Sequence, residues 1–169
     1  MYETQDDLVA LQALLDKSFA TAGSHLAGML EAPMTARDVV AHLEGICEVH
    51  FATVTPSGAP FVAPIDGLFF RGQLWIGIPT AAARTAFVSR ERRISVSYTR
   101  GRSFCLIVHG TAEEVTESDP MWAPYHEYSD REYVKLYGAG FLEWAEQQKA
   151  EGADGDMWRV RAHKMFVKE

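Results

Sequence analysis

The sequence predicts a single α+β domain spanning residues 1–169, in which antiparallel strands form a partly closed β-barrel. Two helical patterns come first, short segments rich in Val, Ile, Phe and Thr follow, and an aromatic helical stretch precedes the last strand. Closure is expected because it removes exposed sheet edges that would otherwise invite aggregation. The length and the 47% hydrophobic content suffice for one sizeable core.

Two helices are expected before the first strand. Thr4 and Asp7 resemble a capping box, and helical spacing then continues to about residue 21. The apolar face of this first helix is formed by Leu8, Leu11, Leu15 and Phe19. After a break at Gly23 and Ser24, Thr35 caps a second helix that ends near residue 45.

The middle of the chain has the pattern of hairpins. Turn signals occur as Pro-Ser-Gly at 56–58 and Arg-Gly at 71–72. Strands are expected at 48–55, 59–70, 73–78, 94–98 and 103–115. One short helix at 81–90 interrupts them, so the sequence predicts a meander with one helical crossover.

Residues 118–149 form an unusually aromatic segment in which two helices are expected. The candidates for inward-facing side chains are Trp122, Tyr125, Tyr128, Tyr133, Leu136, Phe141, Leu142 and Trp144. A flexible link at 151–156 and a final strand at 158–167 follow. If the protein has a substrate, its specificity is expected to lie in this segment, which has the least familiar sequence pattern of the chain.

Composition argues against several partners. The formal net charge of -7 opposes binding to nucleic acid and to anionic membrane surfaces. No apolar stretch approaches the roughly 20 residues that cross a bilayer, and the acidic start does not resemble a signal peptide, so a cytoplasmic location is expected. Cys47 and Cys105 lie in apolar runs and are expected to be reduced and buried. The six histidines form no metal-binding pair, so no metal site is predicted.

Four blocks of sequence resemble one flavoprotein family. The hairpin at 51–64 reads FATVTPSGAPFVAP, and QLWIGI at 73–78 precedes the short helix and the strand at 93–97. HGTAE at 109–113 and WRVRAHKMF at 158–166 complete the set. In this order the blocks resemble the pyridoxamine 5′-phosphate oxidase-like proteins, which bind flavin mononucleotide (FMN). The resemblance implies a split β-barrel with N-terminal helices, a crossover helix and a helical insertion before the last strand.

The start of the crossover helix is the best candidate for a phosphate site. Thr80 and the residues after it supply helix N-terminal amides, and the guanidinium of Arg84 can grip a phosphate. A plainer interpretation puts Arg84 on a solvated helix face; the family resemblance favours phosphate. Ala82 stands where the family usually has Ser, Arg84 where it often has Lys, and Ala162 where it often has Pro.

The resemblance also implies where the isoalloxazine ring lies. The strand 61–64 would run along the ring, the strand 76–78 would flank it, and a partner chain would supply the second wall. The cofactor-binding residues expected on this basis are Phe61, Val62, Ala63, Pro64, Ile76, Gly77, Ile78, Thr80, Arg84 and Trp158.

A homodimer with the cofactor at the subunit interface is implied in the same way. Trp and Arg are favoured at packed interfaces, so Arg100, Arg102, Trp122 and Trp158 are candidates for the shared wall. The alternative for each of the four is that it is an ordinary core or surface residue with no role in an interface.

The function expected is that of an FMN-dependent oxidoreductase acting on a small organic substrate. The flavin carries the reactive chemistry, so no catalytic side chain is identified. The alternatives are a deazaflavin-dependent reductase on the same fold and a non-catalytic module that binds flavin or haem. Pyridoxamine 5′-phosphate oxidase activity itself is disfavoured, because the final strand offers only Arg159 and Arg161 for a substrate phosphate.

Overall fold

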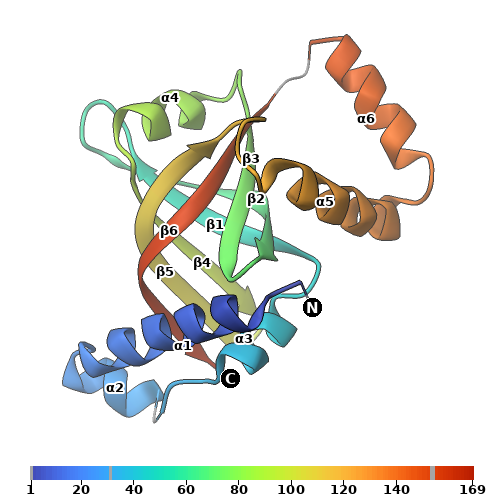
Figure 1. Ribbon diagram of the computed structural model, residues 1–169. Helices are drawn as coiled ribbons and strands as arrows, with labels where there is room; N and C mark the ends of the chain where they lie inside the picture. The colour runs from blue at the N-terminus through green and yellow to red at the C-terminus, as the bar shows by residue number, and fades with distance from the viewer. Residues whose placement is uncertain (1, 31, 153–154) are drawn as a thin grey trace.

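A computed structural model describes residues 2–30, 32–152 and 155–169, and these form a closed six-stranded antiparallel barrel (Figure 1). Around the barrel the strands follow the order β1-β2-β3-β6-β5-β4, and β4 pairs with β1 to close it. The strands are β1 (Ile46–Val54), β2 (Pro60–Phe70), β3 (Gln73–Pro79), β4 (Arg93–Arg100), β5 (Phe104–Val115) and β6 (Gly155–Lys168). The predicted α+β fold class and barrel are therefore confirmed.

The strand pairing is uneven around the barrel. β5 and β6 pair along nearly their whole lengths, with an irregularity between His109 and Gly110. At Gly110 a Cβ would lie 2.2 Å from the carbonyl oxygen of Arg161, so only glycine permits this close approach. β2 and β3 pair only as far as Gly67 and Ile76, and then part. The residues that follow this last pair, Asp66 and Gly77, border the candidate site.

The two ends of the barrel carry different helices (Figure 1). α1 (Gln5–Ala20) and α3 (Ala36–His42) lie at one end, and α4 (Ala83–Arg90) lies at the other. The Thr4 capping box and the Thr35 cap are both present, as predicted. The expected break after Gly23 is only partial, because a short helix, α2 (Ser24–Leu30), forms directly after it.

The barrel interior is the main core. Its largest fully buried side chains include Phe51, Phe104, Leu106 and Ile76. Cys47 is buried and free, whereas Cys105, also free, is only half-buried. Its position on the outward side of β5, in alternation with the inward Leu106, corrects the expectation that both thiols are buried.

Two helices separate β5 from β6. α5 (Trp122–Tyr137) packs beside the barrel, and α6 (Phe141–Ala150) lies beyond α5, away from it (Figure 1). α6 has no buried residue among those described. Tyr125 and Tyr128 face inward as predicted, but three other predicted core residues are exposed: Leu136, Leu142 and Trp144. Leu136 lies on α5 and the other two on α6, and within the described ranges these three side chains are left largely uncovered.

The insertion ends just before β6. The predicted link at 151–156 falls partly on residues 153 and 154, outside the described part of the chain, and β6 already begins at Gly155. Among the described helices, none combines the length and the apolarity that a bilayer crossing requires.

Candidate functional site at the outer face of β2

Residues on β2 alternate between the two sides of the barrel wall. Phe61 and Ala63 are half-buried, whereas Val62 is 62% exposed and Pro64 is also exposed. Phe61 packs edge-on against Phe87 of α4, with ring centroids 5.4 Å apart. Of the four residues predicted on this strand, Val62 and Pro64 therefore present their side chains on the outside of the barrel. Phe61 and Ala63 shape the wall behind them.

β3 contributes backbone rather than side chains to this face. Ile76 and Ile78 are fully buried in the barrel core, while Gly77 between them is exposed. Ile76 and Ile78 were expected to flank a flavin as part of the strand 76–78, and the two-residue period of the strand turns both of their side chains inward. At Gly77 the absence of a side chain leaves the strand accessible to a flat ligand.

Trp158 lies inside the barrel and not on the outer face. Its side chain is 1% exposed and belongs to the main core, where the guanidinium carbon of Arg92 lies 4.5 Å from the ring centroid. The predicted role of this indole in a wall shared with a partner chain is therefore wrong. Its register partner Ile76 also faces inward. The other wall candidates lie outside the core: Trp122 is half-buried, and Arg100 and Arg102 are exposed.

The start of α4 borders the same face. Thr80 is exposed, and Ala82, at the N-cap, makes no side-chain capping hydrogen bond, so the first amides of the helix keep donor capacity. Arg84 is half-buried, and its Nη1 donates to the carbonyl oxygen of Pro64 at 3.0 Å. This bond ties α4 to the outward-facing part of β2. Because a guanidinium has five N–H donors, others remain for an anion.

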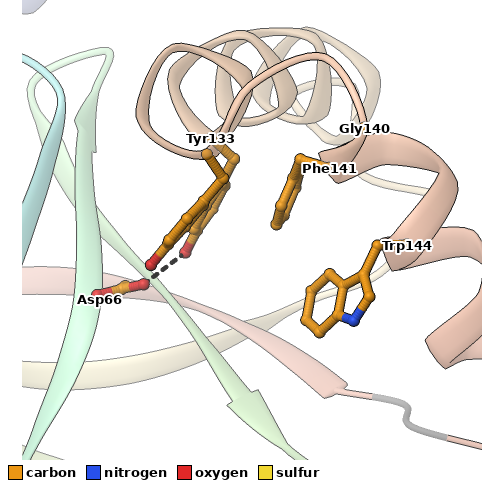
Figure 2. Close-up of a pocket in the computed structure, with 6 residues that line it drawn as sticks. Asp66, Tyr133, Gly140, Phe141 and Trp144 are labelled. Carbon is orange, nitrogen blue, oxygen red and sulfur yellow. Dashed lines mark hydrogen bonds between the residues drawn. The ribbon is translucent and has the colours of Figure 1, made fainter.

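An aromatic pocket of about 660 Å³ adjoins this face (Figure 2). It is lined by Asp66, Tyr133, Tyr137, Gly140, Phe141 and Trp144. Asp66 lies two residues after Pro64 on β2, about 7 Å along the strand, so the pocket continues the outer face directly. The hydroxyl of Tyr133 donates to Oδ2 of Asp66 at 3.1 Å, which joins α5 to β2.

The rings of the pocket stack on one another. Tyr133 and Phe141 have centroids 5.0 Å apart and an interplanar angle of 9°, and Tyr137 and Phe141 are 5.6 Å apart at 19°. Trp144 is tilted by 41° to Phe141 at 5.7 Å. Tyr137 is 63% and Trp144 54% exposed, so a large part of this aromatic surface is free to contact a ligand.

Tyr133 keeps its proton in this setting. Burial raises the pKa of its hydroxyl, and the negative charge of Asp66 raises it further. The phenol therefore remains a hydrogen-bond donor to the carboxylate across the physiological pH range. The part of the chain that the structure describes gives Asp66 no Lys or Arg ion-pair partner.

The sequence interpretation placed the aromatic helices at the mouth of the site but did not identify Asp66. Its signal was present: a carboxylate interrupts an otherwise apolar strand at an outward-facing position. Nδ1 of His126, on the same helix as Tyr133, lies 2.9 Å from the carbonyl oxygen of Trp122. In the described ranges no three His, Cys, Asp or Glu side chains come together in a way that could hold a metal ion.

Comparison with known proteins identifies the fold. No family model matches the chain, and no curated protein matches it. Solved structures do. An F420 reductase is 23% identical with a TM-score of 0.54, over 75% of this chain and 94% of that one. HutZ, the haem storage protein from Vibrio cholerae, is 14% identical with a TM-score of 0.57, over 78% and 91%. A proposed pyridoxamine 5′-phosphate oxidase from Listeria innocua is 11% identical with a TM-score of 0.52, over 78% and 94%.

The chain shares the split-barrel fold of these solved structures. Identities this low establish the fold alone, and the neighbours differ in what their names say they do. The residues of this chain must therefore decide which ligand fits. A phosphorylated planar ring needs a flat apolar surface and a site for its phosphate. The outer face of β2 with Gly77 offers the first, and the start of α4 with Arg84 offers the second.

Proposed function

We propose that the protein is an FMN-dependent oxidoreductase that acts on a small organic substrate. The observation that carries the proposal is the continuity of one surface. The exposed apolar side of β2, at Val62 and Pro64, runs from the start of α4 with Arg84 to the aromatic pocket at Asp66. A phosphate site, a ring platform and a substrate pocket would thus lie in the order that a flavin enzyme needs.

Each part has a role in this proposal. Arg84 and the first amides of α4 would neutralise the FMN phosphate, and Thr80 would add a hydroxyl in place of the one missing at Ala82. Val62, Pro64 and Gly77 would support the ring. The bound flavin would supply two-electron transfer. The residues around the aromatic pocket would orient the substrate and limit the access of water.

A second copy of the chain would cover the other side of the ring. Val62 leaves more than half of its apolar surface exposed, which is the surface that a partner and a cofactor would bury together. Arg102 is exposed, whereas Arg100, although exposed, already contacts the ring of His42 and lies over the ring of Phe104. Equilibrium sedimentation with and without FMN tests the dimer, and a purely monomeric protein at micromolar concentration would contradict it.

A deazaflavin coenzyme is the nearest alternative, since an F420 reductase has the same fold. A non-catalytic role is the other alternative, since a haem storage protein also shares it. Parallel equilibrium titrations with FMN, a deazaflavin and haemin rank the three ligands. Reduction of the bound flavin by a nicotinamide, followed by many reoxidation cycles, separates an enzyme from a storage module.

Substitution of Arg84 tests the placement of the phosphate. We expect Arg84→Ala to weaken FMN binding at least tenfold, measured by quenching of FMN fluorescence, because a charge-assisted contact is lost. Arg90→Ala is the matched control: Arg90 is on the same helix and also donates to strand carbonyls, those of Val54 and Thr55, but lies at the other helix end. Equal losses in the two variants, or none in Arg84→Ala, would refute the phosphate site.

A further inference from the structure

We infer that the aromatic pocket selects an organic cation: a small molecule with a flat apolar body and a protonated or quaternary nitrogen. Calling this molecule the substrate rests on the proposed function; the affinity of the pocket for it does not. The inference combines three features of the described residues: aromatic walls, an acidic floor and the absence of a basic lining.

The walls suit a cation and a planar group equally. The faces of Tyr and Trp rings carry partial negative charge, so they attract cations as well as other rings. Trp144 and Tyr137 offer the most exposed ring surface, on α6 and α5 respectively. The turn at Gly138 to Gly140 connects the two helices, and Figure 2 shows Phe141 and Trp144 of α6 beside the hollow that Tyr133 of α5 also lines.

The floor of the pocket supplies the charge. Asp66 accepts one hydrogen bond, at Oδ2 from Tyr133, and the described chain places no cation on it. Glu48 is its register partner on β1 and points to the same outer side. Two carboxylates directly opposite each other on neighbouring strands repel each other, and this repulsion destabilises the fold. A bound cation would reduce the repulsion between Asp66 and Glu48. No described salt bridge involves Glu48 either.

The same residues disfavour an anion. Neither Lys nor Arg lines the pocket, and the chain as a whole carries a formal net charge of -7. A substrate with a phosphate or carboxylate group would meet Asp66 without a compensating charge. The pocket thus differs from the opposite end of the site, where Arg84 and the start of α4 favour phosphate.

The test uses binding of probes that undergo no reaction. Benzyltrimethylammonium is the cation, benzyl alcohol the neutral analogue and benzenesulfonate the anion, each titrated by calorimetry and by tryptophan fluorescence. We expect the cation to bind at least tenfold more tightly than the neutral analogue, with no saturable binding of the anion. Trp144→Phe should remove most of the fluorescence response while calorimetric binding persists. Equal binding of the three probes, or preference for the anion, would overturn the inference.

Asp66→Asn tests the floor of the pocket directly. The amide oxygen can still accept from Tyr133, so we expect the fold to persist and cation affinity to fall at least tenfold. Asp130→Asn is the matched control, because Asp130 is exposed on α5 and does not line the pocket. Undiminished cation affinity in Asp66→Asn would overturn the inference. If that variant fails to fold, the comparison of the three probes on the unaltered protein still tests whether the pocket prefers a cation.

Failure of the two proposals can be told apart. FMN binding is read from flavin fluorescence, and cation binding is read by calorimetry on protein freed of flavin. A protein that binds the cation but not FMN would refute the proposed function alone. A protein that binds FMN but not the cation would refute the pocket's selectivity alone.

Discussion

The outer face of β2 has two halves. Both carry apolar side chains, but only one half is covered by another element of the protein. In one half, Leu68 and Phe70 are each 2% exposed, because α5 packs on them together with Trp75. In the other, Val62 is 62% exposed and no element of the described chain covers it. Asp66 and Tyr133 mark the boundary.

The difference separates a half of the strand that contributes to the core from a half that the proposed function assigns to binding. The covered half forms a second aromatic cluster with its own stacking, in which Tyr125 lies on Trp75 at 4.5 Å and 14°. The open half is similarly apolar but remains available to a ligand or a second chain. Changes in the first half should therefore alter unfolding, and changes in the second should alter binding.

The largest effect is expected from Tyr125→Ala. The ring is 3% exposed and contacts both Trp75 and Phe70, so its removal should cost about 3 to 5 kcal/mol of unfolding free energy. Urea denaturation followed by tryptophan fluorescence measures this. Tyr137→Ala, at a position 63% exposed, should cost less than about 1 kcal/mol. Similar costs for both would mean that α5 does not separate a covered from an open region.

Val62→Glu tests the open half. A charge on this exposed position should change the unfolding free energy by no more than about 0.5 kcal/mol. It should nevertheless weaken FMN binding at least tenfold, since a carboxylate would replace the apolar platform under the ring. Fluorescence titration with FMN and urea denaturation of the same sample give the two values. A large loss of stability with unchanged affinity would reverse the assignment of the two halves.

The smallest effect is expected at the edge of the covered half, where Glu113 accepts from Nε of Arg161 at 2.5 Å and from Nε of Arg159 at 3.0 Å. Arg159 also lies over the ring of Trp75, 5.3 Å from its centroid. The hydrogen bond from Arg161 lowers the pKa of Glu113, outweighing its partial burial, and the charge of Arg159 lowers it further. The folded state thus binds this proton more weakly than the unfolded chain does.

It follows that Glu113 stabilises the fold above its unfolded pKa of about 4.3, and that this contribution is lost as the pH falls through the lower folded value. Glu113→Gln should cost about 0.5 kcal/mol at pH 7, a value limited by solvent screening, and less at about pH 2. Denaturation at both pH values measures the difference, with Glu117→Gln as an exposed control. A cost that is independent of pH would exclude an ionic origin.

Local signals account for most of what the sequence predicted correctly. Thr4 and Thr35 cap helices through contacts within three residues, and the turns after Thr55 and Phe70 separate strands where expected. The side of the barrel wall that an apolar strand residue faces could not be predicted in this way. Trp158, a candidate for the wall shared with a partner chain, is buried in the core, and its local sequence does not say which side of the wall it faces. Leu136, Leu142 and Trp144 do lie on helices as expected, but the described part of the chain leaves their side chains exposed.

The sequence by itself determined the α+β composition, the element order and a barrel of alternating strands, because capping, turn formation and side-chain alternation act over a few residues. Only the tertiary structure decided that Tyr133 meets Asp66, 67 positions apart, and that α5 covers one half of β2 while leaving the other open. Such contacts depend on how distant segments pack, and packing is set by the whole core at once rather than by any local pattern.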